Sequence, residues 1–101
     1  MYKRQLLKSS LFDLKVGENG KDLNRFAFVV SKKIDKRATT RNRIKRKFRS
    51  CIENNFENIE KGYDFLFIIR KNILEENYCE SIIALLKKEK LYNENLNTKN
   101  N

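Results

Sequence analysis

The chain has 101 residues, and its 23 lysines and arginines outnumber its 13 aspartates and glutamates to give a formal net charge of +10. This length suffices for one modest hydrophobic core, and a hydrophobic share of 40% argues against wholesale disorder. A small protein with so much positive charge is expected to bind a polyanion, either nucleic acid or an anionic membrane surface.

The first third of the chain is predicted to form a hairpin of two strands. Residues 11–16 largely alternate between apolar and polar side chains, which is typical of a half-buried strand. Gly17 and Gly20 mark the reversal, and Asn19 is suited to positive φ. Residues 25–31 are more apolar, so we expect this second strand to lie further inside the sheet.

A basic amphipathic helix is predicted over residues 41–56, with one of the threonines at 39–40 as its N-cap. Its apolar residues fall on one stripe at helical spacing: Ile44, Phe48, Cys51, Ile52 and Phe56. Asn42, Arg46 and Arg49 fall on the side that faces away from this stripe. The stripe is therefore expected to hold the helix on a core with its basic side outward.

The rest of the chain is predicted to add one strand and one helix. Residues 65–69 are apolar on both faces, which indicates a central strand. The last helix, residues 75–91, is expected to turn four side chains inward: Tyr78, Ile82, Leu85 and Leu86. Residues 93–101 are rich in asparagine and are predicted to be a disordered tail. The fold class is therefore α+β, a small sandwich in the order strand, strand, helix, strand, helix with helices over one sheet.

Cys51 and Cys79 lie 28 residues apart in a chain without histidine. This spacing fits no zinc site, and two cysteines are too few for a disulfide scaffold. We therefore expect two reduced, buried thiols. No apolar run approaches the length of a membrane span and the N-terminus lacks the apolar segment of a signal peptide, so a cytoplasmic protein is expected.

Positive charge is concentrated between Lys32 and Arg49, where ten bases and one acid give a net charge of +9. Solubility is served by dispersed charges of mixed sign, so this concentration predicts a phosphate-binding surface. A helix that lies in a membrane surface would need its apolar stripe for lipid, whereas this stripe is needed to cover residues 65–69. Nucleic acid is therefore favoured over a membrane. A general RNA-binding protein of ribosomal type and a DNA-binding module could both use such a basic helix.

The sequence predicts no catalytic or metal-binding residues. Without histidine, acid–base chemistry would fall to carboxylates or lysines. The acids cluster around the predicted turn and the start of the last helix, where solvation and the helix dipole explain them. No nucleophile–base pair, glycine-rich phosphate loop or metal-ligand spacing is present.

Three segments together resemble the bacterial ribonuclease P protein family: FAFVVSKKIDKRATTRNRIKRKFR, GYDFLFIIR and the helix that ends in LLKKEKLY. The resemblance covers roughly residues 25–92 and centres on the family's RNR motif. The matching positions are Arg41, Asn42, Arg43, Lys45, Arg46 and Arg49. Residues 1–92 are accordingly expected to form a single RNA-binding domain.

The resemblance implies a protein cofactor of a ribozyme. In that family the RNA subunit, with bound Mg²⁺, hydrolyses the phosphodiester that joins the 5′ leader to precursor tRNA. The holoenzyme is thus an endoribonuclease, and the protein is expected to bind the RNA subunit and the leader but no membrane and no small-molecule substrate. The RNR positions are implied to bind the RNA subunit, and a groove between helix and sheet is implied to hold the leader.

Strand alternation predicts where that groove lies. Phe26, Phe28 and Val30 are expected in the core under the last helix, whereas alternate small residues face the other side. The residues expected to line the groove or bind leader phosphates are Ala27, Val29, Ser31, Lys32, Lys33, Lys36 and Arg37. The alternative is that Ala27 and Val29 pack against the basic helix.

Two further features are implied by the resemblance. The family joins the strands on either side of the RNR helix by a left-handed crossover, although the general rule is right-handed. The family also has an N-terminal helix that walls the leader groove. Only about ten residues precede the first predicted strand here, so this helix is expected to be short or missing.

Overall fold

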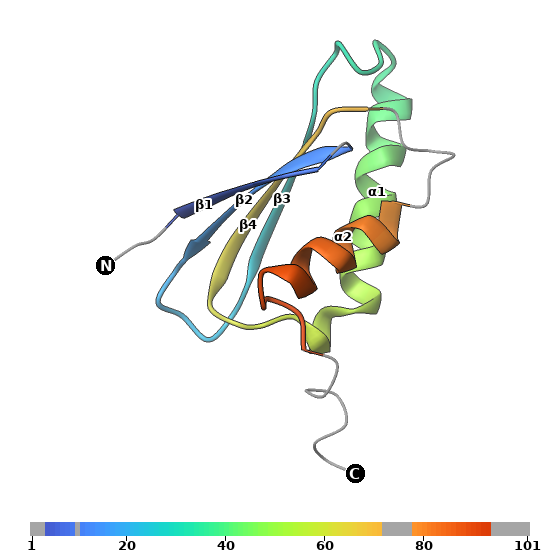
Figure 1. Ribbon diagram of the computed structural model, residues 1–101. Coiled ribbons are helices and arrows are strands. Elements are labelled where there is room, and N and C mark those ends of the chain that lie inside the picture. The colour runs from blue at the N-terminus through green and yellow to red at the C-terminus, as the bar shows by residue number, and fades with distance from the viewer. Residues whose placement is uncertain (1–3, 10, 72–77, 94–101) are drawn as a thin grey trace.

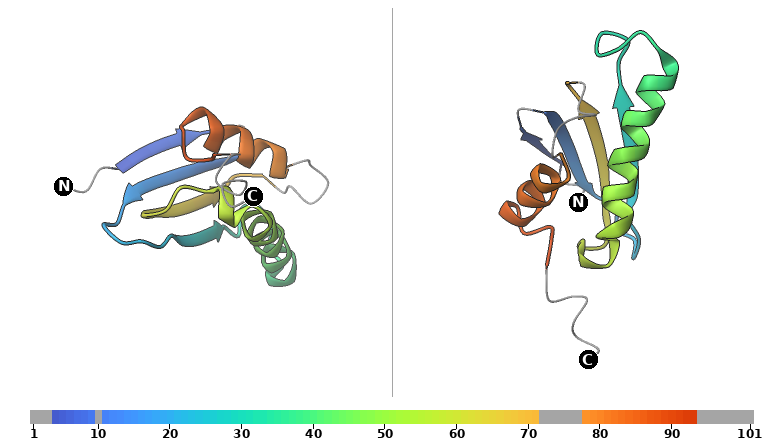
Figure 2. Two further views of the ribbon diagram at one scale, coloured as in Figure 1. Left: turned by 90° about the horizontal axis from the view of Figure 1, so that it is seen from below. Right: turned by 90° about the vertical axis from the view of Figure 1, so that its right-hand side faces the viewer.

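The computed structural model describes residues 4–9, 11–71 and 78–93 (Figure 1). One sheet contains β1 (Arg4–Lys8), β2 (Phe12–Glu18), β3 (Arg25–Val30) and β4 (Tyr63–Ile69). The helices are α1 (Ala38–Asn54), α2 (Tyr78–Lys88) and the short 3₁₀ helix η1 (Phe56–Asn58). Both α-helices lie on one face of the sheet, as Figures 1 and 2 show, so the predicted α+β sandwich is confirmed.

The strands lie in the order β1-β2-β4-β3, with β2 antiparallel to both of its neighbours and β3 parallel to β4. The predicted hairpin is therefore wrong, because β4 lies between its two strands. β4 holds this position because Phe65, Phe67 and Ile69 are buried under the helices while its other face is half-buried. As predicted, β4 is central; the expectation that residues 25–31 lie further inside the sheet is wrong, because β3 is an edge strand.

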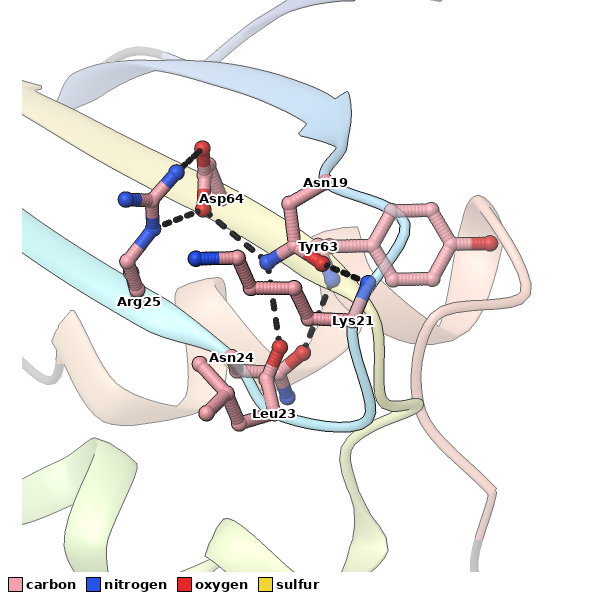
Figure 3. Close-up of polar contacts among 7 residues, drawn as sticks. All are labelled: Asn19, Lys21, Leu23, Asn24, Arg25, Tyr63 and Asp64. Carbon is pink, nitrogen blue, oxygen red and sulfur yellow. Dashed lines mark hydrogen bonds and ion pairs between the residues drawn. The ribbon is translucent and has the colours of Figure 1, made fainter. Parts of the chain in front are cut away.

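The strand β2 continues through Gly17 to Glu18, so the chain reverses after Glu18 and not at Gly17 as predicted. Gly20 has φ +69°, but Asn19 does not adopt the positive φ predicted for it. The Asn19 side chain instead forms the turn, because its carbonyl oxygen accepts the Lys21 N–H at 2.8 Å (Figure 3). Gly62 has φ +95°, and a Cβ there would lie 3.0 Å from the Lys21 carbonyl oxygen, so glycine is required at this point.

The strand β1 was not predicted from the sequence, because RQLLK shows no clear alternation. It pairs with β2, and its Leu7 packs against the core while Leu6 is 52% exposed on the other face. Among described residues 4–9 and 11–18, no helix precedes or interrupts these strands.

The connection β3-α1-β4 is a left-handed crossover. In the right-hand view of Figure 2, both strands run upward, α1 returns in front of them, and β4 lies to the left of β3. The resemblance implied this handedness, which is opposite to the general rule for parallel strands.

The helix α1 begins at Ala38 after Arg37, and no side chain caps it. The predicted threonine cap is wrong, because Thr40 lies within the helix on its buried stripe. The stripe otherwise contains the predicted residues Ile44, Phe48, Cys51 and Ile52. Phe56 is an exception: the helix ends at Asn54, so Phe56 lies in η1 and is 44% exposed.

Aromatic rings form much of the core. The rings of Phe26 and Phe28 stack on Phe65 and Phe67 with centroid distances of 5.0 and 5.5 Å. Phe26 and Phe28 point into the core, as predicted. We expected them to pack under the last helix, but the rings that they contact outside the sheet are Phe56 in η1 and Phe48 in α1. They therefore help to fix α1 against the sheet.

The helix α2 is described from Tyr78, so its predicted start at residues 75–77 lies outside the described residues. Ile82 and Leu86 are fully buried, as expected, and Leu85 is partly buried. Asn93, predicted to be part of the disordered tail, donates its N–H to the Asn58 carbonyl at 2.8 Å and belongs to the fold. The rest of the predicted tail, residues 94–101, is outside the described residues. No helix in the described part of the chain combines the length and apolarity that spanning a membrane requires.

Cys51 in α1 and Cys79 in α2 are joined by a disulfide, with their Cα atoms 5.7 Å apart. The prediction of two reduced thiols is therefore wrong. Sequence spacing could not reveal the pair, because the fold of the two helices onto one sheet face brings the cysteines together.

We expect protein purified without reductant to show no free thiol when it is titrated in denaturant. Reduction should then release two thiols and lower the free energy of unfolding by roughly 3 to 4 kcal/mol, the entropy estimate for a closed loop of this length. Urea unfolding before and after reduction measures the difference. Two free thiols before reduction would contradict the disulfide.

Candidate nucleic-acid interface

The bases of α1 point in three directions, because the helix turns by about 100° per residue. The flank nearest β3, which we call the β3 flank, carries Arg41, Lys45 and Arg49. The opposite flank, the α2 flank, carries Arg43, Lys47 and Ser50. The outward side between the two flanks carries Asn42 and Arg46, as predicted, whereas Arg49, which was predicted there too, lies on the β3 flank. The structure thus distributes the predicted RNR residues around the exposed half of the helix.

Arg41 differs from the other predicted RNR residues because it supports the preceding loop. It is half-buried, and its Nη1 donates hydrogen bonds to the carbonyl oxygens of Asp35 at 3.0 Å and Lys36 at 2.8 Å. These bonds hold the loop between β3 and α1 in one conformation. Arg41 therefore positions Lys36 and Arg37, two predicted phosphate ligands.

Arg37 is engaged by Asp35. The Asp35 carboxylate accepts hydrogen bonds from the Arg37 backbone N–H at 2.8 Å, from Nε at 3.1 Å and from Nη2 at 3.0 Å. The bonds from the Arg37 side chain and then its backbone lower the pKa of Asp35 from 3.8 to about 2, and Asp35 raises the pKa of Arg37. A phosphate that binds Arg37 must therefore compete with this carboxylate.

Arg49 lies over the Phe28 ring, with its guanidinium carbon 5.7 Å from the ring centroid. The contact directs Arg49 toward the free edge of β3 and fixes its long side chain. Among the described residues, Arg43, Arg46 and Arg49 have no ion-pair partner, and all three are exposed. Their charge is available to a polyanion.

The sheet face opposite the helices, which we call the open face, combines apolar side chains of β3 and β4 with charged side chains of β2. The strand register places Leu6, Lys15, Leu66 and Ala27 in one row across it, and Lys8, Asp13, Ile68 and Val29 in the next. Ala27 is exposed and Val29 is 45% exposed, so neither packs against α1. Their predicted outward orientation is confirmed.

The other predicted groove residues continue from the open face toward α1. Ser31, Lys32 and Lys33 are exposed in the turn that follows β3, where the Ile34 N–H bonds to the Ser31 carbonyl at 3.1 Å. Lys36 is also exposed, just before α1. The loop that carries these residues connects the end of β3 to the start of α1 (Figure 1).

Sequence reasoning missed Lys15, which places a base in the middle of the open face. Beside it, around Gly17, lies a hollow of about 420 Å³ whose other lining residues include Ala27 and Leu66. The alternation of residues along β2 is enough to predict that the Lys15 side chain points away from the core. The sequence does not reveal that β2 lies inside the sheet, because the pairing of β2 with β4 joins segments that are far apart in the chain.

Asp64 and Arg25 fix one end of the open face (Figure 3). Arg25 donates to the two carboxylate oxygens of Asp64, from Nε at 2.7 Å and from Nη2 at 2.6 Å. Asn19 adds a bond from Nδ2 to Asp64 at 3.0 Å, and the Asn24 oxygen accepts the Tyr63 N–H at 3.0 Å. The network ties the loop after β2 to the start of β4 and orients Arg25.

No group of three or more histidine, cysteine or carboxylate side chains within the described ranges is arranged to hold a metal ion. The arginines and lysines on α1 and around the open face offer positive charge and hydrogen-bond donors of the kind that bind phosphate.

Comparison with known proteins identifies similar chains. A family model described as Ribonuclease P matches residues 1–91, further toward the N-terminus than the resemblance in the sequence. The ribonuclease P protein component of Alkaliphilus oremlandii is 36% identical over 94 residues, which are 90% of this chain and 82% of that protein. The structure of the RNase P protein from Thermotoga maritima is 32% identical, with a TM-score of 0.76 over 85% of this chain and 84% of that one. The Staphylococcus aureus RNase P protein is 26% identical, with a TM-score of 0.77 over 89% and 84%.

The depressed pKa of Asp35 gives a testable pH dependence. Because the pKa is lowered in the folded protein, the ion pair with Arg37 contributes fully above 3.8 and is lost as the pH falls through about 2. An NMR titration of the Asp35 carboxyl carbon should show a midpoint near 2, and Arg37→Gln should raise it toward 3.8. Lys36→Gln removes a neighbouring charge that makes no bond to this carboxylate and serves as control. A wild-type midpoint near 3.8 would contradict the geometry.

Proposed function

Since the chain belongs to the ribonuclease P protein family, we propose that it binds the RNA subunit of ribonuclease P and the 5′ leader of precursor tRNA as the protein subunit of the holoenzyme. One observation carries this proposal: the RNR residues lie on the exposed side of a helix that is packed rigidly beside the open face of the sheet. The family match favours this function over a ribosomal-type protein or a DNA-binding module.

Binding of the RNA subunit rests on the exposed arginines of α1. Each arginine that neutralises a phosphate releases counterions, which supplies most of the sequence-independent affinity for RNA. The buried stripe of α1 orders the helix before RNA arrives, so only side chains need to be ordered on binding. Arg46 and Arg49 lie on the surface facing away from the core and are well placed for these contacts.

Leader binding rests on the open face. A single strand of RNA can lie across Leu66, Ile68 and Val29, while Lys15 and Lys32 neutralise its phosphates. The two rows of side chains across this face contain no aromatic ring among the described residues. Bases would therefore contact aliphatic side chains rather than stack on rings, which favours weak discrimination between leader sequences.

In this proposal Mg²⁺ would be held mainly by the RNA subunit and not by residues of this chain, and it would supply water activation and charge neutralisation at the phosphate that is cleaved. The protein contributes by holding the leader and by reducing the electrostatic repulsion between the RNA subunit and precursor tRNA. Cytoplasmic tRNA maturation is the process in which such a holoenzyme would act.

The test of this function is cleavage of precursor tRNA by a bacterial ribonuclease P RNA at a magnesium concentration too low for the RNA alone. Addition of the purified protein should restore cleavage at the boundary between leader and mature tRNA. A folded protein that binds this RNA no better than an unrelated hairpin, and does not stimulate cleavage, would refute the proposal.

Reversing two exposed charges should weaken RNA binding without unfolding the protein. Arg46→Glu with Arg49→Glu should flatten the plot of log affinity against log salt by roughly 0.7 to 0.9 for each lost contact. Loss of the Arg49–Phe28 contact should cost only about 0.5 to 1 kcal/mol of stability. Filter binding at several salt concentrations measures the slope.

The matched control is Lys61→Glu with Lys88→Glu, which changes the net charge equally at exposed positions outside α1. If the double arginine variant binds the RNA subunit as tightly as this control does, the assignment of the exposed side of α1 fails.

Neighbouring valines in β3 separate the open face from the core. Val30 is 7% exposed, so Val30→Asp buries a charge and should unfold the protein at a cost of several kcal/mol. Val29→Asp should stay folded and bind the RNA subunit, yet lower the preference of the holoenzyme for leader-bearing precursor over mature tRNA. Circular dichroism and competition binding measure the two effects. An unchanged preference in folded Val29→Asp would place the leader elsewhere.

A further inference from the structure

The chain has two cysteines, and both are used in the disulfide that joins α1 to α2. Disulfides persist in oxidising compartments, whereas in a reducing cytoplasm they are usually transient and serve catalysis or redox sensing. The tRNA maturation proposed above takes place in the cytoplasm, so a permanent structural link is unexpected if that proposal holds. The surroundings of the two cysteines show how the link can open in the folded protein.

The two cysteines differ in their access to solvent. Cys51 is 4% exposed and belongs to the core, whereas Cys79 is half-buried. Cys79 lies in the wall of an open groove of about 350 Å³, which Asn55 after α1 closes on one side. The other lining residues belong to α2: Glu80, Ile83, Ala84 and Lys87. A small thiol can therefore approach Cys79 through this groove, while the core covers Cys51.

The groove contains one charged side chain of each sign, Lys87 and Glu80. The Lys87 ammonium lies 5.4 Å from the centroid of the Tyr92 ring, which holds it at this end of α2. The attacking group in thiol–disulfide exchange is a thiolate, which carries a negative charge. Lys87 should therefore attract the attacking thiolate, and Glu80 should repel it.

The position of α2 does not depend on the disulfide alone. Ile82 and Leu86 are fully buried. The Tyr78 ring stacks on Phe48 with centroids 5.4 Å apart, and the Tyr78 hydroxyl donates to the Lys47 carbonyl oxygen at 3.1 Å. These contacts hold α2 on the sheet after the link opens. A disulfide acts mainly by constraining the unfolded chain, so the reduced protein keeps its fold but unfolds more readily.

We infer that Cys79 is a site of thiol–disulfide exchange in the folded protein, and that the disulfide is a redox-sensitive link that sets the resistance of the chain to unfolding. A reductant thiolate attacks the Cys79 Sγ and forms a mixed disulfide, while Cys51 leaves as a thiolate and takes up a proton. The second thiolate of a dithiol reductant then attacks its own sulfur in the mixed disulfide and releases Cys79, which also takes up a proton. The reductant ends as a disulfide, and its two electrons reduce the protein.

Reduction of the RNA-free protein by dithiothreitol, followed by titration of the released thiols, tests the site. If Cys79 is attacked in the folded protein, the rate should stay within about twofold as urea is raised below the unfolding transition. If reduction requires unfolding, the rate should rise with the slope of the unfolding equilibrium, roughly fivefold or more per molar urea. That result would overturn the inference. A small-molecule disulfide controls for any effect of urea on the exchange chemistry itself.

Neutralising each charge of the groove tests the route of attack. At low salt Lys87→Gln should slow reduction roughly two- to fivefold, and Glu80→Gln should speed it by a similar factor. Lys88→Gln removes the same charge at the neighbouring exposed position outside the groove and should behave as wild type. Loss of stability cannot imitate slower reduction, because unfolding exposes the disulfide. Unchanged rates in both groove variants would show that the reductant does not enter by this groove.

Digestion by subtilisin measures the effect of the link on unfolding. Because the cysteines are 28 residues apart, reduction should speed digestion of the RNA-free protein roughly hundredfold or more. In the control, Cys51→Ala with Cys79→Ala, reductant should change nothing. Equal digestion of oxidised and reduced wild type would refute a role in stability. None of these measurements contains RNA, so a failure of the proposed function would leave their outcomes unchanged.

Discussion

The position of α1 depends on the ring of one residue, Phe48. Its ring centroid lies 5.6 Å from that of Phe12 in β2, 5.7 Å from Phe67 in β4 and 6.2 Å from Phe28 in β3. The fourth ring, Tyr78, belongs to α2. Three strands and both helices therefore meet at this side chain, and the packed rings leave α1 only one rotation about its axis. That rotation decides which bases point toward β3 and which toward α2.

The central strand separates two surfaces with different chemistry. One face of β4 buries Phe65, Phe67 and Ile69 beneath the helices, whereas Leu66 and Ile68 form the middle of the open face. Because the left-handed crossover places α1 beside the edge strand β3, the basic helix and the open face adjoin along that edge. A rigid cationic helix and a shallow apolar surface suit, respectively, phosphates and the bases of an unpaired strand.

Local patterns in the sequence predicted local structure well. The stripe of Ile44, Phe48 and Ile52 follows from helical periodicity, and the outward orientation of Val29 follows from strand alternation. The start of α1 was predicted too late because the sequence did not reveal that Asp35 and Arg41 shape the loop before it. The prediction of a hairpin was wrong because the position of β4 between β2 and β3 depends on contacts between distant segments of the chain. Tyr78 and Lys47 lie 31 residues apart, so the hydrogen bond between the Tyr78 hydroxyl and the Lys47 carbonyl also depends on tertiary structure.

The strand order also constrains how the protein can be made. Synthesis proceeds from the N-terminus, so β2, β3 and α1 all emerge from the ribosome before β4. Until then β2 and β3 have no strand to join them, and the apolar stripe of α1 has no finished sheet to cover. The nascent chain thus exposes a basic helix with an uncovered apolar side in a compartment crowded with ribosomal RNA. Cotranslational folding of the whole RNA-facing surface waits for one late segment, residues 63–69.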